Sequence, residues 1–199
     1  MKTESIYFIW AHPRADSLTA HIVEEMQGQA ARDGVSTTTL DLYRSGFDPV
    51  LGTEDEPDWN DSTKRLSPEV HRLFGELEGK DTLVVVFPVW WYSFPAIIKG
   101  YMDRVWNHGL AYGEGHRLPA RKIHWVGLVG GSEERFARRG WLANMTDFFN
   151  GIGGYLGIEK TEVTFLYNTI GVEEDIVDRE RHFENLFAEA RGVVSGLAA

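Results

Sequence analysis

The chain alternates between short apolar runs and longer segments in which apolar residues recur every three or four positions. Three runs are almost continuously apolar, at Ser5–Ala11, Thr82–Phe87 and Lys122–Val129, which is typical of strands that are buried on both faces of a sheet. Two further runs, Val35–Leu42 and Thr161–Tyr167, alternate apolar and polar positions, as edge strands can. The pattern therefore predicts five strands, with the two alternating strands at the edges.

Five segments with a helical apolar period separate or follow these strands. They cover Leu18–Arg32, Pro68–Glu78, Pro95–His108, Trp141–Leu156 and Asp175–Leu197. Strands that alternate with helices indicate an α/β protein, with a parallel sheet covered by helices on both faces. With the alternating strands at the edges, the strand order becomes 2-1-3-4-5, and we expect residues 1–199 to form one domain.

In a sheet of this order, ligands bind beyond the carboxyl ends of strands one, three and four. The loop after the first strand contains His12 and Arg14, and it ends at Ser17, which is placed to cap the next helix. A capped helix N-terminus favours an anion such as a phosphate, although a plain capped turn is an equal alternative. The loop contains neither GxGxxG nor GxxxxGK[ST], so it is not a Rossmann dinucleotide site or a P-loop.

Aromatic residues and glycines follow the third and fourth strands. Trp90, Trp91 and Tyr92 are consecutive, and three consecutive rings cannot all point into one core. Gly130 and Gly131 allow a ligand to approach the backbone closely. One loop suits a phosphate, one a flat ring and one the edge of that ring, which together describe a flavin nucleotide on a flavodoxin-like three-layer sandwich. For the three aromatic residues, the alternatives are a hydrophobic corner or a dimer contact. For the two glycines, the alternative is a flexible turn.

Composition and net charge exclude several classes of partner and site. The chain has 20 Lys and Arg against 30 Asp and Glu, and the net charge of −10 argues against nucleic acid and anionic lipid as partners. It has no cysteine, which excludes disulfides, thiolate metal sites and cysteine nucleophiles. It shows neither a signal peptide nor a membrane-spanning run, so we expect a cytoplasmic protein. We expect no metal site, and we interpret Glu54, Asp55, Glu56 and Asp58 as a solvated acidic loop.

Aromatic residues form 13% of the chain. The rings on apolar stripes are predicted to lie in the core: Phe8, Phe74, Phe148, Phe149, Phe183 and Phe187. The remaining notable rings are predicted to frame a ligand: Trp90, Trp91, Tyr92, Trp106, Tyr112 and Trp141.

Several motifs occur together in this chain. They include Ala11-His12-Pro13, Asp41-Leu42-Tyr43, Ala111-Tyr112-Gly113 and, most specifically, the stretch Phe87–Val105. With these motifs the chain resembles the NAD(P)H dehydrogenase (quinone) family, the DT-diaphorase-like branch of the flavodoxin-like fold. It is also similar to flavoproteins that are associated with glutathione-gated potassium efflux systems.

The resemblance implies a homodimer with one FAD per active site, FMN being the alternative, and with each site built across the subunit interface. The residues that it implies for flavin binding are His12, Ser17, Leu18, Thr19, Pro88, Val89, Trp90, Trp91, Tyr92, Gly130, Gly131 and Ser132. Trp91, Tyr92, Gly130 and Gly131 would lie closest to the reaction. Tyr112, supplied by the partner, and Trp141 would border the substrate.

The resemblance also implies a ping-pong reaction, in which NAD(P)H reduces the flavin by hydride transfer and a quinone or related electrophile then takes two electrons. A flavin-binding regulatory partner of a membrane transporter, such as a potassium efflux system, and a flavodoxin-type electron carrier are the alternatives. The Tyr and His that follow the double glycine in mammalian members are absent here, and Arg135, Arg138 and Arg139 occur in that segment. We hypothesise that one of these arginines binds a phosphate or assists the reduced flavin, a solvated basic turn being the alternative.

Overall fold

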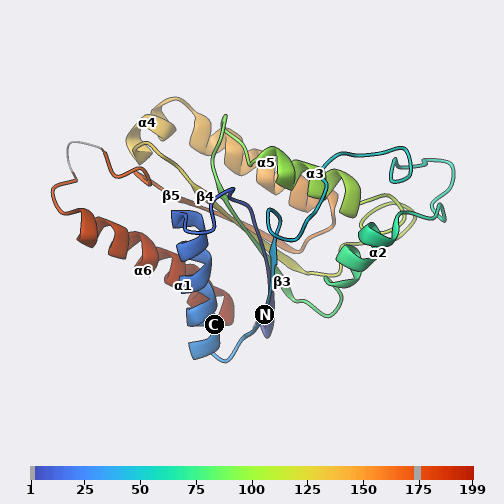
Figure 1. The fold of residues 1–199 in the computed structure, drawn as a ribbon, viewed down its shortest axis with the longest axis horizontal. Coiled ribbons are helices and arrows are strands. Elements are labelled where there is room, and N and C mark those ends of the chain that lie inside the picture. Colours follow the sequence, from blue (N-terminus) through green and yellow to red (C-terminus); the bar gives the residue numbers. More distant parts are fainter. Residues whose placement is uncertain (1–2, 173–175) are drawn as a thin grey trace.

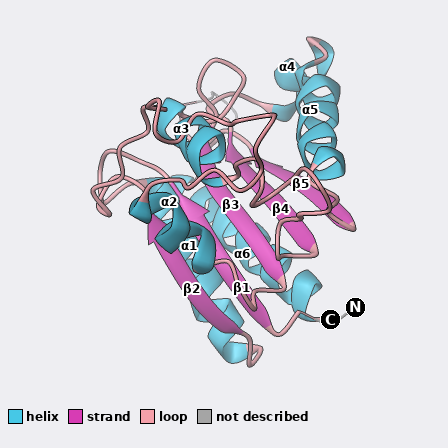
Figure 2. Ribbon diagram, turned by 90° about the vertical axis from the view of Figure 1, so that its right-hand side faces the viewer, coloured by secondary structure: helices cyan, strands magenta, loops and turns pink. Residues whose placement is uncertain are grey.

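The computed structural model describes residues 3–172 and 176–199, which contain one parallel sheet between two layers of helices (Figure 1). The strands are β1 (Ser5–Trp10), β2 (Ser36–Asp41), β3 (Thr82–Pro88), β4 (Lys122–Leu128) and β5 (Lys160–Leu166). Their order is β2-β1-β3-β4-β5, and each neighbouring pair is parallel (Figure 2). The predicted fold class and strand order are therefore confirmed.

The helices lie close to their predicted positions, with one addition. They are α1 (Leu18–Arg32), α2 (Pro68–Gly75), α3 (Ala96–Val105), α4 (Glu133–Arg138), α5 (Trp141–Tyr155) and α6 (Arg179–Ala198). The short helix α4 was not predicted. The predicted last helix was placed from Asp175, which lies outside the described residues.

Apolar residues of alternate strand positions form two layers of core. On one face, Ile6 and Phe8 of β1 pack with the apolar stripes of α1 and α6. On the other face, Tyr7 and Ile9 pack with residues of α2, α3 and α5. Figure 1 shows α1 and α6 on one side of the sheet and α3 and α5 on the other. Both faces of the central strands are buried, which explains their continuous apolar sequence.

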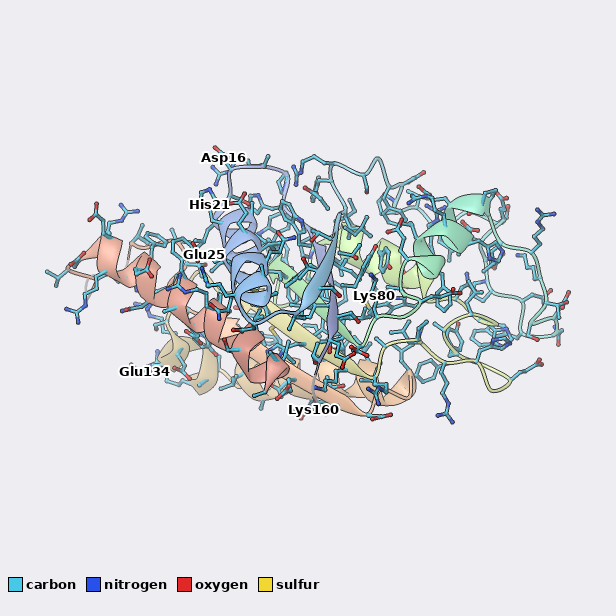
Figure 3. All side chains as sticks on the ribbon, turned by 90° about the horizontal axis from the view of Figure 1, so that it is seen from below. Asp16, His21, Glu25, Lys80, Glu134 and Lys160 are labelled. Atoms are coloured by element: carbon cyan, nitrogen blue, oxygen red, sulfur yellow. The ribbon has the colours of Figure 1, made fainter. Side chains whose placement is uncertain are left out.

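Helices α1 and α6 lie side by side along one face of the sheet (Figure 3). Glu25 of α1 accepts a hydrogen bond from Arg191 of α6 at 2.7 Å, at the rim of their shared apolar stripe. This packing fixes the orientation of α1, whose N-terminus faces the loop that follows β1.

The acidic loop before α2 is anchored to α3 by a buried ion pair, so the expectation of a solvated loop is wrong for Asp55. Arg104 of α3 donates to Asp55 at 2.8 Å and to Glu69 at 2.8 Å. The N–H and Oγ of Ser67 donate to the same Asp55 carboxylate, at 2.8 and 3.0 Å. Burial alone would raise the pKa of Asp55, but these hydrogen bonds outweigh it and hold the pKa below its usual value.

Candidate functional site

The loop between β1 and α1 surrounds the N-terminus of α1. Ser17 is buried, and its Oγ accepts the N–H of Ala20 at 3.2 Å, which confirms the predicted cap. The N–H of Arg14 lies 3.1 Å from His12 Nδ1, and the carbonyl oxygen of Arg14 lies 3.3 Å from the same nitrogen. Burial and the charges of Arg14 and Arg44 lower the pKa of His12 below its ordinary value. At neutral pH, His12 therefore offers a hydrogen-bond donor rather than a full charge.

The loop after β3 is a tight hairpin whose two central residues are Trp91 and Tyr92. The N–H of Trp90 donates to the carbonyl of Ser93 at 2.9 Å, and the N–H of Ser93 donates back at 3.0 Å. Trp91 and Tyr92 have φ angles of +52° and +59°, a left-handed conformation that bulky residues rarely adopt. Trp91 is 96% exposed as a result. Strained backbone of this kind concentrates at functional sites.

A cleft of about 390 Å³ opens beside this hairpin, at the carboxyl ends of β3 and β4. It is lined by Val89, Trp91, Tyr92, Val129, Gly130, Gly131, Ser132, Arg135, Phe136, Arg139 and Trp141. The rings of Tyr92 and Trp141 stack with their centroids 3.8 Å apart and an interplanar angle of 11°. This stack joins the hairpin to the start of α5, so the cleft has an aromatic wall of the kind that suits a flat ring.

The two glycines of this cleft differ in their surroundings. A Cβ on Gly130 would lie 2.7 Å from Cδ1 of Ile170, so this glycine lets the chain segment after β5 pack closely. A Cβ on Gly131 would meet no atom within 4 Å, so this backbone borders open space in the cleft. Gly131 is therefore the better placed of the two to accept a ligand against its backbone.

The structure gathers most of the predicted site residues, but not all in the cleft. Those that line it are Val89, Trp91, Tyr92, Gly130, Gly131, Ser132 and Trp141. Trp90 and Pro88 belong to the adjoining hairpin and strand end, and the ring of His12 lies 6.0 Å from that of Trp90. The phosphate-suited loop and the cleft are thus neighbours. Beside Ser17, Thr19 is buried and Leu18 is half-buried against the core.

Helix α4 and its C-cap residue bring two of the three candidate arginines to the cleft. Arg135 and Arg139 line it, whereas Arg138 does not and instead pairs with Glu134 at 3.7 Å. Phe136, from the same helix, and Val129 also line the cleft and were missed by the sequence analysis. A signal for α4 was present, because Ser132 is followed by acidic residues in a first turn, a common helix start.

Tyr112 lies away from this cleft, on an apolar groove of about 570 Å³. The groove is lined mainly by α3, α5 and the loops near them, including Leu51, Pro57, Lys99, Met102, Trp106, Tyr112, Phe148, Ile152 and Tyr155. Two predictions about aromatic residues near this groove need correction. Trp106, the C-cap residue of α3, is only 5% exposed, and its ring packs in the core against those of Tyr101 and Trp125. Phe148 is 47% exposed and faces the groove.

Within residues 3–172 and 176–199, no group of three or more His, Asp and Glu side chains is arranged to hold a metal ion. Across the same described residues, no helix combines the length and apolar character that a membrane span requires.

Comparison with known proteins agrees with this fold. A family model described as the flavodoxin-like fold matches residues 4–188. The chain is 52% identical over 197 residues to an uncharacterized NAD(P)H oxidoreductase of Escherichia coli K12, YcaK, covering 99% of this chain and all of that one.

Two solved structures share the fold at lower identity. The NAD(P)H:quinone oxidoreductase from Methanothermobacter marburgensis has a TM-score of 0.83 at 23% identity, over 97% of this chain and 98% of that one. An FMN-dependent NADH-azoreductase from Bacillus anthracis, in complex with FMN, has a TM-score of 0.69 at 17% identity, over 98% of this chain and 100% of that one. By its sequence match and its strand order alike, the chain belongs to the flavodoxin-like fold family.

Proposed function

We propose that this protein is a flavin-dependent NAD(P)H oxidoreductase that delivers two electrons to a quinone or a related electrophile. One observation carries the proposal. A capped helix N-terminus with His12 beside it adjoins an aromatic-walled cleft. The ring centroid of His12 lies 6.0 Å from that of Trp90, which belongs to the hairpin beside the cleft. One part suits a phosphate and the other a flat ring, which is the composition of a flavin nucleotide. The name of the 52% identical relative supports the use of NAD(P)H.

The residues present fit a flavin nucleotide. Gly131 leaves its backbone open to the cleft, and the Tyr92–Trp141 stack gives the cleft a flat wall. When bound, the flavin supplies the two-electron chemistry, and the residues of this chain bind it, orient it and exclude water. We favour FAD because of the resemblance to the DT-diaphorase-like branch. FMN is the alternative, and it is the flavin in the Bacillus anthracis structure.

The proposal extends to a second copy of the chain. Tyr112 lies on the apolar groove, 5.3 Å from the ring of the largely exposed Tyr155, rather than on the cleft of its own subunit. In a homodimer, the groove of one subunit and the cleft of the other would together enclose the substrate, with Tyr112 at the border. A cytoplasmic location, with access to NAD(P)H, belongs to the same proposal.

Arg139 is our candidate for contact with a phosphate of NADPH. It lines the cleft, and a guanidinium binds phosphate with two parallel hydrogen bonds. Arg139→Gln should raise the KM for NADPH about threefold to tenfold and leave the KM for NADH nearly unchanged. Arg138→Gln is the matched control, because this neighbour does not line the cleft. An Arg139→Gln variant whose KM values for NADPH and for NADH both equal those of the wild type would contradict this assignment.

The function is tested on the purified protein. We expect a yellow protein with one flavin per chain, which oxidises NAD(P)H only when a quinone is added. Heat release of the flavin followed by chromatography then distinguishes FAD from FMN. A protein that binds neither FAD nor FMN would contradict the proposal. A stable one-electron form of the flavin during reductive titration would favour an electron carrier instead.

A further inference from the structure

Arg44 lies after the carboxyl end of β2 and reaches across to the loop that follows β1. Its Nη2 donates to the carbonyl of His12 at 2.6 Å, and its Nη1 donates to the carbonyl of Pro13 at 3.2 Å. Its Nε pairs with the carboxylate of Asp41. One planar guanidinium is therefore directed at three acceptors, two in the β1–α1 loop and one at the end of β2.

The guanidinium is also held from the sheet side. Its Cζ lies 4.9 Å from the ring centroid of Trp10 and 6.0 Å from that of Tyr43. Asp41 is itself fixed, because its Oδ1 accepts the N–H of Tyr43 at 3.0 Å and that of Arg44 at 3.2 Å. Trp10 and Asp41 are the paired last residues of β1 and β2. Arg44 thus attaches the loop to the rigid end of the sheet.

These contacts determine which groups of the loop can meet an anion. A carbonyl oxygen repels a phosphate, and the oxygens of His12 and Pro13 are both engaged by Arg44. The N–H of Arg14 is directed to Nδ1 of His12, so this backbone N–H is engaged within the loop. The positive charges of Arg14 and Arg44 also lie beside this loop, in a chain of net charge −10.

We propose that Arg44 is a positioning residue, which holds the β1–α1 loop in the one shape that accepts the phosphate of a flavin nucleotide. The inference rests on the proposed function, because it assumes that the phosphate binds at this loop. It goes further in assigning the shape of the loop to a residue outside that loop. The planar fork is essential to the argument, because a lysine would keep the charge but could not direct three donors at these acceptors.

The test compares three flavins that differ only beyond the ring and ribityl chain: riboflavin, FMN and FAD. Dissociation constants are measured with flavin-free protein by quenching of flavin fluorescence. Arg44→Gln and Arg44→Lys should weaken FMN and FAD binding about tenfold to hundredfold. Binding of riboflavin, which carries no phosphate, should change by less than about twofold.

Two further variants complete the experiment. Arg72→Gln is the matched control, because Arg72 is also an exposed arginine in a local ion pair, with Glu76 at 2.6 Å, but it lies on α2. It should leave the affinities for all three flavins unchanged. Asp41→Asn removes the charged partner of Arg44 and keeps an oxygen for the N–H of Tyr43, so it should show the same selective loss to a smaller degree.

Three results would overturn the inference while the wild type still binds FMN. They are unchanged FMN binding in both Arg44 variants, equal losses for riboflavin and FMN, and full recovery of affinity with lysine. Equal losses would indicate a merely structural role, and recovery with lysine would indicate that charge alone suffices. If the wild-type protein binds none of the three flavins, the proposed function itself fails, and this inference fails with it.

Discussion

The phosphate half and the ring half of the proposed site are built in opposite ways. In the phosphate half, the β1–α1 loop, the polar groups satisfy one another: Ser17 caps α1 and Arg44 binds two loop carbonyls. In the ring half, the loops after β3 and β4, Trp91 and Tyr92 hold a left-handed backbone, and Trp91 is exposed. The phosphate half is therefore preorganised at little strain, whereas the ring half stores strain and apolar surface that a bound ring could cover.

The largest effect is expected in the ring half, from filling the open space at Gly131. Gly131→Val places a side chain where no protein atom lies within 4 Å, so the fold should tolerate it while the cleft loses room for a ring. We expect flavin affinity to fall by at least about a hundredfold and the melting temperature of the flavin-free protein to stay nearly constant. Gly154→Val, at another open position, is the control and should bind flavin normally. Wild-type affinity in Gly131→Val would place the ring elsewhere.

Removal of the helix caps compares the two halves directly. Ser17→Ala should lower the free energy of unfolding by about 1–2 kcal/mol, because Ser17 is buried and caps a helix of 15 residues. Ser132→Ala should cost less than about 0.5 kcal/mol, because it caps the six-residue α4 through a contact of 3.4 Å. Urea unfolding of both variants measures the difference. Equal losses would show that the halves are not built differently.

Relief of backbone strain at Trp91 should stabilise the ring half and weaken its binding of flavin. Trp91→Asn loses almost no buried surface, and asparagine tolerates a positive φ, so the flavin-free protein should gain about 1 kcal/mol of stability. Flavin affinity should fall in the same variant. Trp59→Asn serves as the comparison, because Trp59 is exposed but does not have a positive φ. A destabilised Trp91→Asn protein would argue against stored strain.

The smallest effect concerns the pH response of the phosphate half. Because the folded-state pKa of His12 lies below that of the unfolded chain, the unfolded chain binds the extra proton, and stability falls as pH drops below about 6.5. His124, whose pKa burial lowers to about 4, causes a larger acid loss in every variant. The contribution of His12 is therefore the difference between wild type and His12→Gln, which should lose slightly less stability on acidification. A His12→Gln protein with a steeper acid loss would contradict the sign.

The phosphate half could be predicted from sequence better than the ring half, and the reason is the range of the interactions. The Ser17 cap depends on residues within three positions, so a local pattern reveals it. Strand order could be predicted because burial on one or both faces leaves a periodic signature. The left-handed turn at Trp91 and Tyr92 could not, because bulky residues seldom adopt it.

Other differences have equally physical causes. Helix α4 has six residues and one buried apolar side chain, Phe136, which is too little for a period to show. The prediction of a solvated Asp55 is wrong because its partner Arg104 stands 49 positions away in the sequence, and no local pattern indicates such a pair. Phe148 lies on an apolar stripe, as a core residue would, but faces a groove that only the tertiary structure creates.

The central claim, that the two halves together hold one flavin nucleotide, is tested most directly by one pair of dissociation constants. Flavin-free wild-type protein is titrated with FMN and with riboflavin, and fluorescence quenching gives both values. The account predicts one site per chain for each, with FMN bound at least about tenfold more tightly because only FMN reaches the phosphate half. Equal affinity for the two flavins, or binding of neither, would contradict the account.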